Sequence, residues 1–243
     1  MTCLPETPPA VRVVTWNVWD LKGDTAALAR VLRALEPDVV CLQEAPRRLN
    51  APRRIARLAA ATGLQLGAVG RGSGGTAVLL GPRAQRLAGW TFRLPVPPLA
   101  RSRGAAVCLV RVGGLELAVA SIHLPLTAER RLAHATRVRD VVAGVALPVV
   151  VAGDLNEPPG SPAWQLLAVQ ASDRTPGAPA TFPARDPQTR LDAVLLGPGL
   201  RALEVPQGAM ALGAAEVTDD LLVASDHRPV LAVITSTTEP GRS

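Results

Sequence analysis

Side chains that can take part in catalysis recur at one kind of place in this sequence, directly beside short apolar runs. They are Asn17, Glu44, His123, Asp154, Asn156, Asp192, Asp226 and His227. Such runs have the length and composition of β-strands, and strand ends open onto the sheet edges where sites are built. A single polar residue there is usually a turn or a solvated strand end. Because two of only three histidines belong to the set, its members are predicted to form one site.

Two carboxylates and one amide of this set suit a hard divalent cation. Mg²⁺ takes oxygen ligands and is usually held by one or two carboxylates together with water. Glu44 and Asp226 can supply the carboxylates, and Asn17 can supply a neutral oxygen. No cysteine belongs to the set, which argues against a zinc–thiolate site. The sequence therefore predicts a magnesium site formed by Asn17, Glu44 and Asp226.

The remaining members of the set fit the hydrolysis of a phosphate ester. Asp154 can orient or deprotonate an attacking water molecule. His123, His227 and the Asn156 amide can donate hydrogen bonds to the phosphate oxygens, on which negative charge develops. Asp192 is far from His227 in the sequence, yet it is predicted to bond one ring nitrogen of this histidine. Such a partner would fix the orientation of the ring and raise its pKa.

The elements that must position these residues are mostly short strands. The predicted strands are Val11–Trp16, Val39–Leu42, Ala77–Leu80, Ala105–Val112, Leu115–Ile122, Val149–Ala152, Leu191–Leu196 and Val230–Ile234. Gly113-Gly114 predicts a hairpin turn, so at least part of the sheet is antiparallel. Helices are predicted over residues 25–36, 53–61 and 128–142, and from residue 162 onward. This mixture favours an α+β layered fold.

The chain as a whole is predicted to form one domain. The 243 residues suit a domain over residues 11–234, between a flexible arm at residues 1–10 and a flexible tail at residues 235–243. The scattered Cys3, Cys41 and Cys108 indicate neither a disulfide framework nor a metal site. We find no signal peptide and no apolar stretch long enough to span a membrane. A monomeric cytoplasmic protein without membrane insertion is expected.

The charge of the chain is compatible with an anionic partner. The formal net charge is +6, with 26 lysines and arginines. A basic balance suits nucleic acid or another phosphate-bearing molecule. An arginine-rich composition with a merely solvated surface would give the same charge, so the charge alone does not decide the substrate.

The order of the motifs resembles that of the endonuclease/exonuclease/phosphatase superfamily, which has the deoxyribonuclease-I-like fold. The motifs are Trp16-Asn17, Gln43-Glu44, Ser121-Ile-His123-Leu, Gly153-Asp154-Leu-Asn156, Leu191-Asp192 and Ser225-Asp226-His227-Arg-Pro229. The resemblance covers nearly the whole chain. It implies a four-layer α/β sandwich of two packed mixed or antiparallel sheets flanked by helices, dependence on Mg²⁺ or Mn²⁺, and the roles given above. It also implies that Arg103, which leads a strand, contacts the substrate phosphate.

The resemblance leaves several substrates open. A nuclease fits the basic charge and His123, and we expect a Mg²⁺-dependent phosphodiesterase acting on nucleic acid in an endonuclease-like way. His123 and the absence of tyrosine argue against the apurinic-endonuclease branch. A sphingomyelinase-like enzyme would need apolar loops that contact membranes, and the one candidate, Trp90–Leu99, is interpreted as a packed connection. The sequence also leaves open a sugar-phosphate or other small-molecule phosphatase, and a non-catalytic binding module with the same fold.

Overall fold

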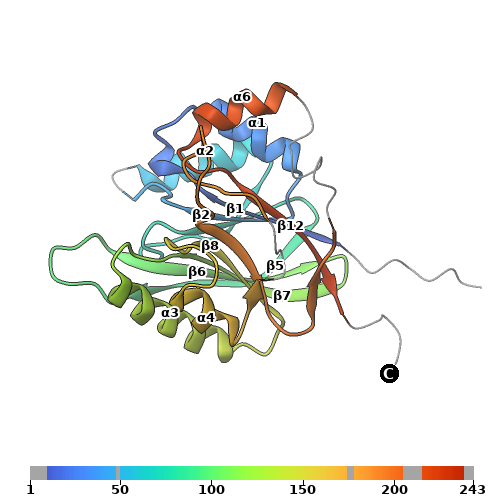
Figure 1. Ribbon diagram of the computed structural model, residues 1–243. Helices are drawn as coiled ribbons and strands as arrows, with labels where there is room; N and C mark the ends of the chain where they lie inside the picture. The colour runs from blue at the N-terminus through green and yellow to red at the C-terminus, as the bar shows by residue number, and fades with distance from the viewer. Residues whose placement is uncertain (1–9, 48–49, 174–177, 205–214, 238–243) are drawn as a thin grey trace, which may run out of the picture.

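The computed structural model describes residues 10–47, 50–173, 178–204 and 215–237. These residues form four layers, in which two six-stranded sheets pack face to face and helices cover the outer face of each sheet (Figure 1). The arrangement confirms the expected sandwich of two packed sheets flanked by helices. No helix in the described part of the chain is long and apolar enough to cross a membrane.

Each sheet contains one parallel pair of strands among antiparallel ones. The first sheet has the order β11-β12-β1-β2-β4-β3, and β1 and β2 are parallel. Its strands are β1 (Val11–Asn17), β2 (Val39–Gln43), β3 (Gln65–Ala68), β4 (Ala77–Leu80), β11 (Leu200–Ala202) and β12 (Val230–Ser236). The second sheet has the order β5-β6-β7-β8-β10-β9, and β7 and β8 are parallel. Its strands are β5 (Ala84–Leu94), β6 (Arg103–Val112), β7 (Leu115–His123), β8 (Val149–Asp154), β9 (Ser172–Asp173) and β10 (Asp192–Leu196).

Helices form the two outer layers (Figure 1). The first sheet is covered by α1 (Thr25–Leu35), α2 (Ala51–Thr62) and α6 (Ala215–Ala224), and the second by α3 (Ala128–Ala143) and α4 (Pro162–Ala168). A short 3₁₀ helix over Trp19–Leu21 follows β1.

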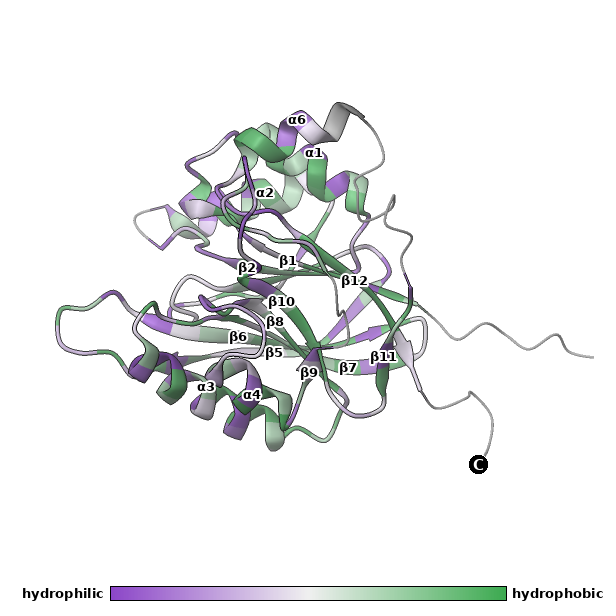
Figure 2. Cartoon of the chain, viewed as in Figure 1, coloured by the Kyte–Doolittle hydropathy of each residue, from purple (hydrophilic) through white to green (hydrophobic). Residues whose placement is uncertain are grey.

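Buried apolar side chains fill the three spaces between the layers. Successive residues of a strand point to opposite faces of the sheet, so Val13 faces the second sheet and Val14 faces the helices. Ile122 and Leu155 lie between the second sheet and its helices. Figure 2 shows the result, with hydrophobic strands in the middle and helices of mixed character outside. Burial of these layers stabilises the fold and fixes the two sheets against each other.

Local sequence signals set several boundaries as predicted. The Asp24 carboxylate accepts hydrogen bonds of 2.8 and 3.1 Å from two backbone amides of the first turn of α1. Gly63 ends α2 in the left-handed conformation, with φ of 73°. Gly113 and Gly114 also have positive φ, and they join β6 to β7 in the predicted hairpin. The predicted free thiols of Cys41 and Cys108 are buried.

The sequence prediction misses β3, β5, β9, β11 and α6. The interpretation of Trp90–Leu99 as a packed connection is wrong for its first half, because Trp90–Leu94 belong to β5. This strand lies at a sheet edge, and many of its residues are partly or fully exposed, so it lacks the continuous apolar run of a buried strand. Pairing with β6 along its whole length forms the strand instead.

The two ends of the domain differ in part from the prediction. The tail expected from Thr235 begins later, because β12 continues to Ser236 and pairs there with β11. The expected arm at residues 1–10, which contains Cys3, lies outside the described residues except for Ala10.

Candidate active site

The strand pairings bring the predicted site residues to one end of the sandwich. Asn17 and Glu44 come at the carboxyl ends of the parallel strands β1 and β2. His123 and Asp154 are register partners at the ends of the parallel strands β7 and β8. Asp192, the first residue of β10, pairs directly with Asp154. Carboxyl ends of adjacent parallel strands share one edge of a sheet, which is where open α/β sheets bind ligands.

His227 reaches this edge from the segment just before β12. The indole nitrogen of Trp16 donates a 2.8 Å hydrogen bond to the His227 carbonyl. The Ser225 hydroxyl donates one of 2.6 Å to the Asn17 carbonyl. The Phe182 ring packs against the His227 ring, with 4.8 Å between their centroids. These contacts fix both the backbone and the ring of His227.

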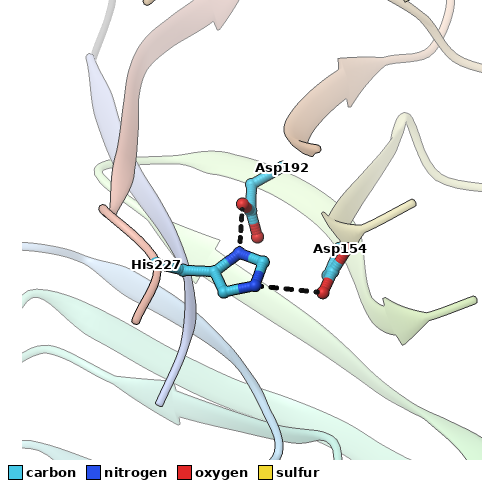
Figure 3. A group of neighbouring side chains, drawn as sticks. All are labelled: Asp154, Asp192 and His227. Atoms are coloured by element: carbon cyan, nitrogen blue, oxygen red, sulfur yellow. Dashed lines mark hydrogen bonds and ion pairs between the residues drawn. The ribbon is translucent and has the colours of Figure 1, made fainter. Parts of the chain in front are cut away.

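His227 and two carboxylates form the centre of the site (Figure 3). The distance from His227 Nδ1 to Asp192 Oδ2 is 2.8 Å, which confirms the predicted pair. On the other side of the ring, Nε2 lies 3.9 Å from Asp154 Oδ2. The second oxygen of Asp192 is buried and has no hydrogen-bond partner among the described residues. His227 is therefore the group that compensates the negative charge of Asp192.

The surrounding carboxylates keep the His227 ring protonated. Burial by itself lowers its pKa, but the hydrogen bond to Asp192 and the charges of Asp192, Asp154 and Asp226 outweigh burial and raise the pKa to about 9. Both ring nitrogens then carry hydrogen. At neutral pH, His227 is thus a cation that donates to Asp192 with Nδ1 and presents Nε2–H to the site.

Asp154 is the carboxylate on which the other polar groups converge. Its Oδ2 accepts a 3.0 Å hydrogen bond from the Asn17 amide nitrogen, and its Oδ1 accepts one of 2.9 Å from the Asn156 backbone amide. Burial and the nearby charge of Asp192 raise the pKa of Asp154 to about 7, although His227 and these hydrogen bonds act in the opposite direction. A carboxylate with a pKa near neutrality is suited to exchange a proton during catalysis.

His123 is neutral, in contrast to His227. Arg103 Nη1 lies 2.9 Å from His123 Nδ1. A guanidinium can only donate, so Nδ1 is the acceptor and Nε2 carries the hydrogen. Burial, followed by the charges of Arg103 and His227, holds the pKa of His123 well below its usual range. Nε2 lies 3.5 Å from Asp154 Oδ2. Arg103, predicted to contact the substrate, therefore also orients His123.

Glu44 lies at the wall of a pocket beside this cluster. Its backbone is left-handed, with φ of 48°. Its half-buried carboxylate makes no hydrogen bond or ion pair with the described residues, and it lines a pocket of about 250 Å³ together with Asp20. An uncommitted carboxylate at a strand end, in a pocket with a second carboxylate, offers the oxygen donors that Mg²⁺ takes. The residues present thus fit the expected ion.

Unlike Glu44, the other two expected metal ligands form hydrogen bonds with other residues of the protein. The Asn17 oxygen accepts a 3.1 Å hydrogen bond from the Trp19 amide, while its nitrogen faces Asp154. Asp226 is half-buried, and its Oδ1 lies 3.4 Å from the Ser225 hydroxyl. The roles of Asn17, Glu44 and Asp226 as magnesium ligands stay a prediction.

A different set of residues has the spacing of a metal site. Within the described ranges, Asp154, Asp192 and His227 have potential ligand atoms that all lie within 4.8 Å of one another. The Nδ1 atom of His227 is already bonded to Asp192, however. In the structure this set is a hydrogen-bonded Asp–His pair beside a second carboxylate.

Asn156 follows Asp154 in the left-handed conformation, with φ of 54°. Its side-chain nitrogen donates a 2.8 Å hydrogen bond to the Leu124 carbonyl. This bond uses one of the two amide hydrogens. The other hydrogen is the one available for the predicted contact with a phosphate oxygen.

Sequence reasoning missed a buried polar network beneath the site. Thr15 donates to the Gln43 side-chain oxygen at 3.2 Å, and the Gln43 nitrogen lies 3.2 Å from the Ser121 hydroxyl. Ser121 in turn donates to the Leu42 carbonyl at 2.9 Å. The three side chains are fully buried and connect β1 and β2 of the first sheet with β7 of the second. The signal was present, because polar residues inside otherwise apolar strands require a partner.

Comparison with known proteins identifies the chain. The sequence profile of the Endonuclease/Exonuclease/phosphatase family matches residues 14–227, and the chain belongs to this family. No curated protein sequence matches it significantly.

Solved structures share the fold at low sequence identity. An endonuclease/exonuclease/phosphatase from Bacteroides vulgatus is 20% identical over 94% of this chain and 99% of its own, with a TM-score of 0.71. The Bacteroides thetaiotaomicron mannosyl-6-phosphatase is 15% identical over 93% and 99%, with a TM-score of 0.68. D. rerio TDP2, complexed with a single-strand DNA product, is 16% identical over 93% and 99%, with a TM-score of 0.66. At these identities, the similarity establishes the fold.

Proposed function

We propose that this chain is a Mg²⁺-dependent phosphodiesterase that cleaves nucleic acid in an endonuclease-like way. The observation that carries the proposal is the position of two histidines around one buried carboxylate, because His123 Nε2 lies 3.5 Å and His227 Nε2 lies 3.9 Å from Asp154 Oδ2. Such a site can accept a proton and donate hydrogen bonds at the same time, as hydrolysis of a phosphodiester requires.

The residues of the chain have distinct roles in the proposed reaction. Asp154 takes a proton from water, whose oxygen attacks phosphorus as the bond to the ester oxygen breaks. His227 Nε2–H, His123 Nε2–H and the free Asn156 amide hydrogen donate to the phosphate oxygens. Asp192 holds His227 in place, and Arg103 holds His123. The leaving ester oxygen takes a proton from His227 Nε2, so the products are a phosphate monoester and an alcohol.

Glu44, the Asn17 oxygen and Asp226 would hold the ion in this proposal. When bound, Mg²⁺ supplies Lewis-acid polarisation of the phosphoryl group and offsets its developing charge. The protein's part is to place these oxygen donors at the ends of β1 and β2 and before β12.

Three observations favour nucleic acid as the substrate. The net charge is +6, and Lys22, Arg47 and Arg101 line the pocket beside Glu44. Basic side chains around a site attract the phosphates of a polyanion. TDP2, which shares the fold, was crystallised with a DNA product.

The proposal is tested by turnover of duplex DNA, single-stranded DNA and RNA in Mg²⁺ and in EDTA. We expect cleavage of at least one nucleic acid in Mg²⁺ and none in EDTA. The variant Glu44→Gln keeps the size of the side chain but removes its charge, so it should weaken Mg²⁺ binding in titration calorimetry and abolish turnover. Full activity in EDTA, or wild-type Mg²⁺ affinity in the variant, would contradict the assignment of Glu44.

One feature favours a lipid phosphodiester as a second candidate substrate. Leu99 is fully exposed in the loop after β5, and Leu126 is 78% exposed in the loop after β7. Exposed leucines on loops can enter a lipid surface. Hydrolysis of sphingomyelin vesicles, with no cleavage of nucleic acid, would favour this candidate. Small phosphomonoesters in the same panel test for phosphatase activity.

A further inference from the structure

The pocket beside Glu44 has a basic wall that the proposed reaction does not use. It is lined by Asp20, Lys22, Glu44, Arg47, Arg101 and Ser102, and its volume is about 250 Å³. Three of these side chains are cations, and only Glu44 and Asp20 are anions. Asp20 also lies 3.8 Å from Arg54, which is not part of the lining. The three cations are thus only partly balanced.

The Arg47 side chain is fixed in the pocket lining by hydrogen bonds to backbone carbonyls. Its Nη1 donates to the Gly74 carbonyl at 3.1 Å and to the Ser102 carbonyl at 2.9 Å. A Cβ atom at Gly75 would lie 2.7 Å from Arg47 Cδ, so a glycine is what lets the side chain lie against this turn. The guanidinium bonds backbone carbonyls, and among the described residues it has no carboxylate within ion-pair distance. Its charge is therefore held in place without being neutralised.

Lys22 and Arg101 add exposed charge to the charge of Arg47. Both are exposed, and neither forms an ion pair with a described residue. Arg101 and Arg47 are close enough for their like charges to repel each other. An anion placed between the three cations would relieve this repulsion and gain hydrogen bonds from charged donors, which are the stronger kind.

Two lining residues connect the pocket to the proposed reaction site. Glu44, an expected metal ligand, forms one wall. Ser102 forms another, and the next residue, Arg103, bonds His123. The pocket therefore adjoins one expected metal ligand and the residue before Arg103, which is predicted to contact the substrate phosphate.

We infer that this pocket is a subsite for a second phosphate group of the substrate, bound by Lys22, Arg47 and Arg101 beside the phosphate that is cleaved. The inference rests on the proposed function and extends it to the substrate. The second phosphate is either the neighbouring phosphodiester of a nucleic-acid strand or a terminal phosphate of a small molecule. Both present the same anionic oxygens to the three cations.

Binding to metal-free protein tests the subsite independently of turnover. Thymidine 3′,5′-bisphosphate and thymidine 5′-monophosphate are compared in EDTA by titration calorimetry. We expect the bisphosphate to bind at least about fivefold more tightly, the scale of one good exposed charge contact. The double variant Lys22→Ala/Arg101→Ala leaves the backbone bonds of Arg47 intact and should remove this preference.

Two control variants separate the subsite from general charge. Arg130→Ala/Arg137→Ala removes two exposed charges from α3, outside the pocket, and should keep the preference. Lys22→Arg/Arg101→Lys keeps both charges and should keep most of the preference for the bisphosphate. Equal affinity of wild-type protein for the two thymidine phosphates, or a preference that survives the alanine double variant, would overturn the inference.

Turnover then distinguishes the two sources of the second phosphate. The substrates are p-nitrophenyl esters of thymidine 5′-phosphate that carry a free 3′-hydroxyl, a 3′-phosphomonoester or a 3′-phosphodiester to a second thymidine. If the subsite binds a strand, both phosphorylated esters have a lower KM than the first, and the alanine double variant removes the advantage. If the subsite binds a terminal phosphate, only the substrate with the 3′-phosphomonoester has a lower KM. Absence of all turnover, with the binding preference intact, would contradict the proposed function and leave the subsite standing.

Discussion

The two site histidines differ in charge because their partners differ. Asp192 accepts from His227 and stabilises the cation, whereas Arg103 donates to His123 and stabilises the neutral ring. Asp154 lies within 4 Å of both rings. A base with an imidazolium on one side and a neutral imidazole on the other can take a proton while both rings still donate to a phosphate.

The first prediction at this scale concerns Asp154. Asp154→Asn keeps the shape of the side chain but cannot take a proton from water. We expect kcat to fall about 10²-fold or more, the scale of a general-base contribution, with little change in KM. Steady-state kinetics on the preferred substrate give both constants. Wild-type kcat in the variant would show that Asp154 is a buried turn residue without a catalytic role.

A second prediction concerns the pH dependence of stability. The folded pKa of His227, about 9, lies above the ordinary value of 6.5. A raised pKa means that protonation stabilises the folded state, so this contribution is complete below about pH 6.5 and is lost as the pH rises through about 9. The difference in unfolding free energy between wild type and His227→Gln should therefore shrink across this window.

Urea unfolding in EDTA at several pH values measures this difference. Asp192→Asn serves as the matched control, because it removes the partner that raises the His227 pKa. It should therefore remove the change of unfolding free energy with pH over the same pH range. A wild-type advantage that stays constant from about pH 6 to about pH 10 would show that the pKa of His227 is not raised in the folded protein.

At the scale of elements, the active site depends on how the two sheets are aligned. Asn17 and Glu44 belong to the first sheet, while His123 and Asp154 belong to the second. The space between the sheets is otherwise apolar, and apolar contacts are not directional. The hydrogen bonds that Gln43 and Ser121 make across this space are directional, so they can fix the alignment.

We therefore predict that Ser121→Ala affects both stability and catalysis. It leaves the Leu42 carbonyl and the Gln43 amide without this partner, which costs about 1–3 kcal/mol of unfolding free energy. We also expect kcat to fall at saturating Mg²⁺, because the site residues on the two sheets lose their alignment. Chemical denaturation and steady-state kinetics measure the two effects.

Thr235→Val is the control for this experiment. Thr235 is fully buried in β12, and its hydroxyl has no hydrogen-bond partner among the described residues. Its replacement should leave stability unchanged or increased, with wild-type kcat. Loss of stability in Ser121→Ala with unchanged kcat would mean that the network holds the sheets together without positioning the site.

At the scale of the whole molecule, the positive charge gives a further prediction. If the charge of +6 serves to bind nucleic acid, each phosphate contact releases counterions, and affinity falls steeply with salt. Binding of labelled duplex DNA in EDTA, followed by fluorescence anisotropy, should weaken by orders of magnitude between low and moderate salt. A flat salt dependence, or no binding at any salt, would favour a lipid or small-molecule substrate.

The sequence by itself determined the class of fold and predicted which residues form the candidate site. Short apolar runs, Asp24 as a helix cap and the Gly113-Gly114 turn are local signals, because neighbours in the chain decide the backbone there. The chemical types of the residues at the strand ends indicated phosphoester hydrolysis. Even the pair of Asp192 and His227 followed from the need of a histidine for an acceptor.

Only the tertiary structure decided how those residues act. The lowered pKa of His123 depends on burial and on Arg103 from another strand, and no local pattern encodes either. The same holds for the bond from Arg103 to His123 and for the link between Gln43 and Ser121. An edge strand such as β5 likewise exists because β6 pairs with it. These features arise from register and packing between distant segments, which are set only when the whole chain folds.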